Sequence, residues 1–206
     1  MLMPKASVTD MSTLVLLARH ASHDEVGSVL SGRSAIALSA AGREEARAMA
    51  RRLAERTPHA VHTSPRRRAQ ETAEIAAGGA GDIRIVPALD EIDFGGWSGR
   101  SFAALEEDPK WQTWNRARST VRAPGGETMA EATERAVTHI AETAEAMDGQ
   151  SLLCVTHCDI VRGVVAHMLG LSADNLLRFD VDPASLTTLE VAPWGMRLVS
   201  LNERAS

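Results

Sequence analysis

The stretch TLVLLARH, residues 13–20, decides the fold. Its first six residues carry no charged side chain, and so short an apolar run is typical of a strand buried on both faces of a parallel sheet. Arg19 and His20 follow directly, at the point where this strand ends. The segment therefore predicts a central strand whose carboxyl end delivers a cation and an imidazole to one edge of the sheet.

Working outward, short strands alternate with helical patterns. Further strands are expected at HAVHT (59–63), DIRIV (82–86) and SLLCVT (151–156), and a closing hairpin at 185–191 and 196–201. Helices are expected at 39–56, from Ser64-Pro65 to the glycines at 78–79, at 127–147 and at 160–169, with two short pieces around Trp111 and Trp114. This alternation predicts an α/β three-layer sandwich: a mostly parallel central sheet with an antiparallel edge strand and helices on both faces.

Composition places the chain among soluble globular proteins. It has 206 residues, of which 44% are hydrophobic and 24% charged. We expect one domain at residues 13–206, preceded by a disordered tail at residues 1–12. These values exclude a disordered chain and a coiled-coil fibre.

Net charge and cysteine content limit which binding partners and which cellular compartment we expect for the protein. The net charge of −5 favours neither nucleic acid nor an anionic membrane as a partner. Cys154 and Cys158 cannot form a disulfide framework, and the start of the chain lacks a secretory signal, so we expect buried thiols in a reducing cytoplasm. The sequence does not decide the oligomeric state, and both a monomer and a homodimer are compatible with it.

Reactive side chains follow each predicted parallel strand. The groups are Arg19-His20, then Ser64 with Arg66–Arg68, then Asp90-Glu91, then His157-Cys158. Because ligands bind beyond the carboxyl ends of such strands, we expect these side chains to converge on one rim.

These residue types suit phosphoryl transfer. Guanidinium groups match phosphate oxygens, and the N-termini of the helices after Ser64-Pro65 and His157 would add backbone donors. A neutral histidine can act as nucleophile, a second, protonated histidine can stabilise charge, and a carboxylic acid can protonate the leaving oxygen. Taken singly, each group has a plainer interpretation. Arg66–Arg68 could be a solvated helix face with one arginine pointing inward, Glu91 could be an exposed acid, and His157 could be a buried structural histidine. Because all of these groups follow predicted strands, their joint position favours a functional site over the plainer interpretations.

Six ordered motifs resemble the histidine phosphatase superfamily, which has the phosphoglycerate mutase-like fold. They are LARH (17–20), LSAAGR (38–43), TSPRRRAQETA (63–73), LDEIDFGGWSG (89–99), PGGET (124–128) and VTHC (155–158). The resemblance spans about residues 14–192 and points to the phosphatase-type branch.

The resemblance implies a role for each site residue. His20 is the phosphate acceptor, Arg19 and Arg68 clamp the phosphoryl oxygens, and His157 is the second pocket histidine. Glu91 is the proton donor and then the base for water. Cys158 stands where the family has glycine and would offer its backbone N–H to phosphate. Val26 replaces the family's asparagine, a space that His23 or Arg33 could fill as part of a substrate rim.

The resulting function is a metal-independent phosphomonoester hydrolase of the histidine acid phosphatase type. It would act on a small phosphorylated metabolite through a covalent phosphohistidine, without a cofactor. The short lid stretch, residues 100–123, favours hydrolysis over a bisphosphate-primed phosphoglycerate mutase. A catalytically weak phospho-ligand-binding or interaction module is the alternative of another class, and a metal hydrolase is disfavoured by the absence of an H-E-x-x-H spacing.

The assigned roles also predict a pH dependence. The neighbouring arginines should lower the pKa of His20, and partial burial should raise the pKa of Glu91. We therefore expect a bell-shaped profile with an acidic-to-neutral optimum.

Overall fold

A six-stranded mixed sheet forms the centre of the molecule. The computed structural model describes residues 12–79, 82–147 and 149–204; the expected tail at 1–12 falls almost wholly outside these residues. The strands lie in the order β3-β2-β4-β1-β5-β6. Strands β1 (Thr13–Arg19), β4 (Ser151–Thr156), β2 (Ala60–Thr63) and β3 (Ile83–Ile85) are parallel. Strands β5 (Leu186–Ala192) and β6 (Gly195–Glu203) continue the sheet antiparallel, which confirms the predicted fold class.

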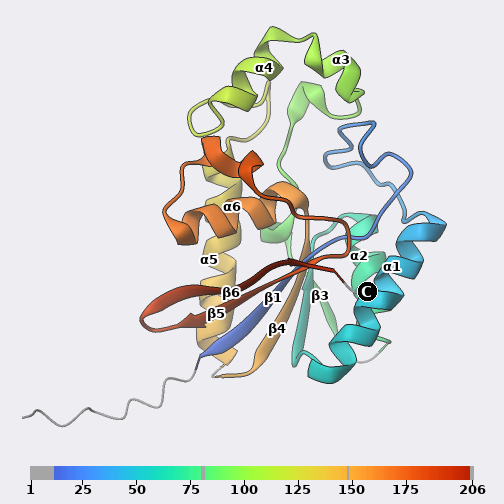
Figure 1. Ribbon diagram of the computed structural model, residues 1–206, viewed down its shortest axis with the longest axis vertical. Helices are drawn as coiled ribbons and strands as arrows, with labels where there is room; N and C mark the ends of the chain where they lie inside the picture. The colour runs from blue at the N-terminus through green and yellow to red at the C-terminus, as the bar shows by residue number, and fades with distance from the viewer. Residues whose placement is uncertain (1–11, 80–81, 148, 205–206) are drawn as a thin grey trace, which may run out of the picture.

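Helices cover both faces of this sheet (Figure 1). Helices α1 (Ala40–Leu53) and α2 (Arg67–Ala76) pack on one face, and α5 (Met129–Met147) and α6 (Cys158–Leu169) on the other. Helices α3 (Phe102–Glu106) and α4 (Pro109–Arg116) stand apart at the top of the view. Short 3-10 turns at 54–56, 87–89, 95–97 and 173–178 complete the elements.

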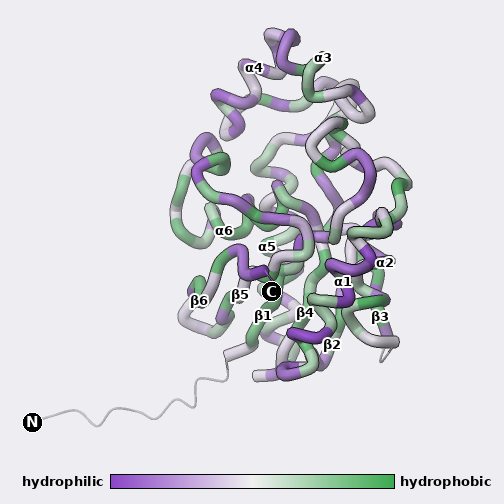
Figure 2. The backbone as a smooth tube through the Cα atoms, turned by 45° about the vertical axis from the view of Figure 1, so that its right-hand side comes forward, coloured by the Kyte–Doolittle hydropathy of each residue, from purple (hydrophilic) through white to green (hydrophobic). Residues whose placement is uncertain are grey.

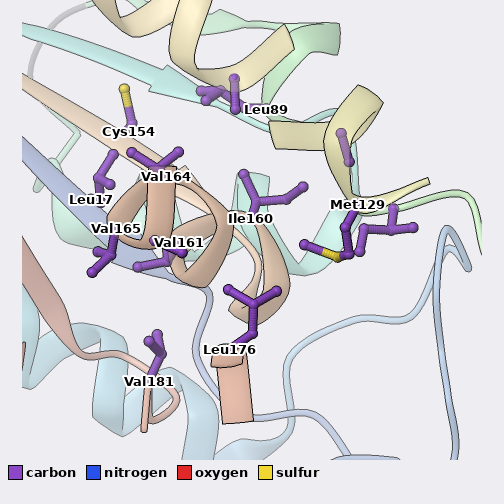
Figure 3. Close-up of a cluster of buried hydrophobic side chains, with 14 of the residues drawn as sticks. Leu17, Leu89, Met129, Cys154, Ile160, Val161, Val164, Val165, Leu176 and Val181 are labelled. Carbon is purple, nitrogen blue, oxygen red and sulfur yellow. The ribbon is translucent and has the colours of Figure 1, made fainter. Parts of the chain in front are cut away.

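The central strands supply both halves of the core, as their apolar sequences require. In β1, Leu16 and Ala18 belong to the cluster under α1 and α2, whereas Val15 and Leu17 belong to the cluster under α5 and α6. This is the two-residue alternation of a strand that is covered on both faces. Figure 2 shows the hydrophobic character of β1 within the sheet. Figure 3 shows how Val161, Val164 and Val165 of α6 pack near Leu17.

Three helix starts differ from the sequence prediction. Helix α5 begins at Met129 rather than at residue 127. Helix α2 begins at Arg67 rather than directly after Ser64-Pro65, because Arg66 is still extended and the Ser64 hydroxyl contacts His157 instead of capping the helix. Helix α6 begins at Cys158 rather than at Ile160, so His157 is its N-cap residue. The two short helices near Trp111 and Trp114 are confirmed as α3 and α4, although Trp111 and Trp114 both lie in α4.

Among the described residues, no helix combines the length and the apolar character needed to span a bilayer.

Candidate functional site

A cavity of about 500 Å³ lies at the carboxyl ends of the parallel strands. Residues that follow β1 and β4 line this cavity, together with residues from the loops at 23–32 and 91–94. The lid helices α3 and α4 and the chain near 177–183 complete the lining. The residues that line it are Arg19, His20, His23, Val26, Gly27, Val29, Leu30, Ser31, Gly32, Arg68, Glu91, Phe94, Phe102, Trp111, Arg118, Cys158, Asp159, Arg162, Leu177, Asp182 and Pro183. The predicted convergence of strand-end residues is therefore present in the fold.

His20 is held at the end of β1 with one ring nitrogen directed at a guanidinium. Its backbone N–H donates to Thr156 O (2.8 Å), which fixes the chain between β1 and β4. Its Nδ1 lies 2.9 Å from Ala21 O, and because a carbonyl only accepts, Nδ1 carries the proton. Nε2 is then the unprotonated nitrogen and accepts from Arg68 Nε (3.1 Å). The ring is thus in the tautomer that a nucleophilic Nε2 requires.

Arg68 bridges the two pocket histidines. It is the one buried member of the arginine triplet, as predicted, whereas Arg67 is exposed and Arg66 pairs with Asp90. Its NH2 lies 3.1 Å from His157 Nδ1 and donates to Gly32 O, and its NH1 donates to Ser34 O. These bonds aim a fixed cation at the space in front of His20.

His157 lies behind the cavity wall and is fully buried. Because Arg68 can only donate to Nδ1, the ring proton sits on Nε2, which donates to the Ser64 hydroxyl (2.7 Å). That hydroxyl lies 3.4 Å from Asp90 Oδ1. Ser64, which the sequence assigned to helix capping, therefore orients the second histidine.

Both histidines are neutral in this site. Burial, followed by the charge of Arg68, holds the pKa of His20 and the pKa of His157 well below their ordinary value. The direction predicted for the pKa of His20 is confirmed, but burial is a larger cause than the arginines. Protonation of His157 during phosphoryl transfer stays a prediction, because burial and the charge of Arg68 here favour its neutral form even with the Glu91 carboxyl 3.8 Å from its Nδ1.

Glu91 brings a buried carboxyl to the cavity beside His157. Its Oε2 lies 3.8 Å from His157 Nδ1, and its Oε1 accepts from the backbone N–H of Ile92 (2.9 Å). Burial and the negative charge of Asp159 raise the pKa of Glu91 to about 7, against the opposing charge of Arg68. This confirms the predicted direction, and it leaves the carboxyl able both to give and to take a proton near neutral pH.

Arg19 adds a second cation beside His20. Its NH1 donates to Val181 O (2.6 Å), and its buried Nε has no acceptor among the residues that the structure describes. An anion in the cavity would supply that acceptor. Cys158 shares the same carbonyl, with its Sγ 3.6 Å from Val181 O. Burial and nearby Asp159 raise the pKa of the Cys158 thiol to about 11, so it is uncharged.

The two rim candidates have different locations. His23 lines the cavity, with its ring centroid 5.4 Å from that of His20. Arg33 is outside the cavity lining: its guanidinium contacts Glu91 O (2.9 Å), Asp93 and Glu127. The surrounding acceptors hold Arg33 behind the acid loop, away from the cavity lining that contains His23.

Sequence reasoning did not identify the support of that acid loop. Glu91 O accepts from both Arg33 and Arg135, and Glu127 binds both of these arginines and the backbone N–H of Asp93. The loop and the Pro124–Glu127 turn are in close contact: a Cβ on Gly126 would lie 2.0 Å from Asp93 O. The P-G-G-E motif was the available signal, but its partner Arg135 is eight residues further along.

An outer group of charges was also missed. Arg118, Asp159 and Arg162 line the cavity, and Arg118 NH1 donates to Asp159 Oδ1 (3.2 Å). Within the described part of the chain, no group of three or more His, Cys, Asp or Glu residues is placed to hold a metal ion.

Comparisons with known proteins identify the family of the chain. The family model described as "Histidine phosphatase superfamily (branch 1)" matches residues 15–204. The chain is 26% identical to phosphoserine phosphatase 1 of Hydrogenobacter thermophilus, over 80% of each chain. It is 31% identical to a protein of Enterobacter sp. (strain 638) named probable phosphoglycerate mutase, over 80% of this chain and 79% of that protein.

A solved structure shows the same fold. The alpha-ribazole phosphatase from Shigella flexneri superposes with a TM-score of 0.82 at 26% identity, covering 93% of this chain and 97% of that one. Phosphatase names among the relatives support phosphomonoester hydrolysis. With a family model that spans nearly the whole chain, this protein belongs to the histidine phosphatase superfamily, branch 1.

Proposed function

We propose that the protein hydrolyses phosphomonoesters of small metabolites through a phosphohistidine at His20, without a metal ion. The observation that carries the proposal is the state of the His20 ring. Its Nδ1–H is fixed on Ala21 O, its Nε2 is unprotonated, and Arg68 and the cavity lie in front of that nitrogen. A neutral, oriented imidazole beside fixed cations is what in-line attack on phosphorus needs.

In the first step the ester's phosphate oxygens would take over the N–H groups of Arg68 that now bind the two histidines. His20 Nε2 attacks phosphorus, an N–P bond forms and the P–O bond to the leaving group breaks. Glu91, protonated, gives its proton to the departing oxygen, and the alcohol leaves. Negative charge on the phosphoryl group offsets the burial of His157 and favours its protonation.

In the second step Glu91 is a carboxylate. It removes a proton from a water molecule, whose oxygen attacks phosphorus. The N–P bond breaks, its electron pair returns to Nε2, and inorganic phosphate leaves with Glu91 protonated again. A carboxyl whose pKa is about 7 suits both halves of this cycle.

The test is to trap the intermediate. Rapid quenching during turnover of a ³²P-labelled phosphomonoester, with chelator present, should give one acid-labile, alkali-stable phosphoryl label on the wild-type protein. The variant His20→Ala should lose the label and on the order of 10⁴-fold or more of kcat. The exposed His167 offers a matched control, since His167→Ala should keep both. Undiminished turnover by His20→Ala would overturn the proposal.

A phosphoglycerate mutase is the second candidate, because one relative bears that name. A mutase would return the phosphoryl group to a second hydroxyl instead of to water. A coupled assay with 3-phosphoglycerate, with and without a bisphosphate primer, separates the two. Primer-dependent formation of the isomer, without phosphate release, would favour the mutase. Binding of phosphate esters with no turnover at all would instead favour an interaction module.

A further inference from the structure

The cavity has a second pole that the hydrolysis of a phosphate group does not use. Arg118 lies just after α4, in the lid region, whereas Asp159 and Arg162 lie on the first turns of α6. All three line the same cavity as His20. Cys158 and Arg162 are four residues apart on α6, about 6 Å along the helix axis, so this pole lies next to the phosphate site.

Arg118 is a buried guanidinium with unused donor capacity. Its side chain is 6% exposed. NH1 donates to Asp159 Oδ1 (3.2 Å) and NH2 donates to Asn115 Oδ1 (2.7 Å). The buried Nε has no acceptor in the described part of the chain. Leaving a buried charged donor unpaired is costly, so an acceptor supplied by a ligand would be favourable here.

The guanidinium is also held rigidly. Its Cζ lies 4.1 Å from the centroid of the Trp114 ring, and Trp114 stacks on Trp111 with centroids 5.3 Å apart. A cation on an aromatic face is stabilised and keeps its orientation. Little conformational freedom remains to be lost when an anion binds, which favours recognition at this position.

The charge balance of this pole is positive. Asp159 is shared between Arg118 and Arg162, whose NH1 lies 3.8 Å from Asp159 Oδ1. Arg162 NH2 also lies 3.8 Å from Asp180 Oδ1, but the Asp180 side chain is 86% exposed, so solvent screens its charge. Among the residues of this pole that line the cavity, two guanidinium groups therefore face one carboxylate. Asp182, also in the cavity lining, is held by Asn202 and lies 3.9 Å from Arg204, so it is not an additional partner for either arginine.

We propose that Arg118, with Arg162, forms an anion subsite, so that the preferred substrates are phosphomonoesters carrying a carboxylate a few bonds from the ester oxygen. The inference rests on the proposed hydrolase function and deepens it. A carboxylate is favoured as the second group because it can accept two N–H bonds from one guanidinium fork. The opposing interpretation is structural: Arg118 only ties the lid region to α6.

Matched substrates separate these interpretations. We would measure kcat and KM for 3-phosphoglycerate and for glycerol 3-phosphate, which differ in carrying a carboxylate or a hydroxymethyl group. Phosphoserine and phosphoethanolamine form a second pair that differs by a carboxylate. A charge-assisted bond predicts a wild-type preference for the carboxylated member of about 10- to 100-fold in kcat/KM. No preference in either pair would overturn the inference, whether or not any variant folds.

The variant Arg118→Gln should remove most of that preference, mainly by raising KM for the carboxylated esters, and Arg118→Lys should restore part of it. A purely structural role would lower kcat/KM equally for both members of each pair, and that result would overturn the inference. Arg116→Gln is the matched control, because Arg116 lies two residues away, is exposed, and donates to Gln112 O within α4. If no phosphomonoester is hydrolysed at all, it is the proposed function that fails.

Discussion

The cavity has an inner pole, formed by the residues around His20, and an outer pole, which is the second pole around Arg118. The two poles are built in different ways. At the inner pole, His20 and His157 stand at the ends of β1 and β4, and Arg68 bonds to both rings. At the outer pole, Arg118 comes from the lid region and meets Asp159 of α6 across 41 residues of sequence. The inner pole is shared with the family motifs, whereas the outer pole depends on residues outside them. Under the two proposals, the reaction chemistry belongs to the strand ends and the choice of substrate belongs to the lid contacts.

The largest expected effect at the inner pole, beyond that of His20, is at Glu91. Glu91→Gln keeps the shape of the side chain but removes the transferable proton. For alkyl phosphates, whose leaving oxygen needs protonation, kcat should fall about 10²- to 10⁴-fold. For p-nitrophenyl phosphate, whose leaving group is stable as an anion, the phosphorylation step should be affected much less. Burst kinetics on the two substrates measure the difference, and equal losses would argue against Glu91 as the acid.

A smaller effect is expected from the support behind Glu91. Glu127→Gln weakens the bonds to Arg33 and Arg135, which both donate to Glu91 O. Since the acid would be mispositioned while the phosphate contacts remain, kcat should fall about 10- to 100-fold with KM little changed. Loss of these partly buried ion pairs should also lower the melting temperature. Glu131→Gln is the control, because Glu131 is an exposed residue in the first turn of α5. A change confined to stability would show that Glu127 has no positioning role.

The smallest effect is a pH shift that links the two poles. The carboxylate of Asp159 adds to burial in raising the pKa of Glu91, which is about 7. Because the proposed mechanism needs protonated Glu91 as the acid, kcat/KM should fall as pH rises through about 7. Because the pKa of His20 is lowered, the acid limb should lie below 6.5. Asp159→Asn removes the repelling charge, so the alkaline limb should move to lower pH. A limb that stays in place or moves upward would contradict this electrostatic link.

The inner pole could be predicted because its signals are local. Apolar runs define β1 and β4, and each reactive residue follows its strand directly, so strand placement alone brings His20 and His157 together. Glu91 and Arg68 were found from their motifs. The position of Arg33 could not be predicted because its acceptors, Asp93 and Glu127, come from a loop and a turn whose contact no periodicity reports.

The outer pole could not be predicted for the same kind of reason. Arg118 lies in a stretch with two short helices and no regular pattern. Its burial depends on stacking against Trp114 and pairing with Asp159, which are tertiary contacts. The start of α6 was placed two residues late, so Asp159 was not recognised as part of its first turn. The role of Ser64 was missed because its hydroxyl contacts His157 in addition to the backbone N–H of Arg66, the N-cap residue of α2.

The central claim is that His20 Nε2 attacks phosphorus while Arg68 changes partners. A crystal structure with orthovanadate, which mimics the five-coordinate phosphoryl group, tests it most directly. We predict vanadium within bonding distance of His20 Nε2, with Arg68 Nε and NH2 bound to vanadate oxygens instead of the two histidines. Vanadate bound elsewhere in the cavity, with Arg68 Nε still hydrogen-bonded to an unmodified His20, would contradict the account.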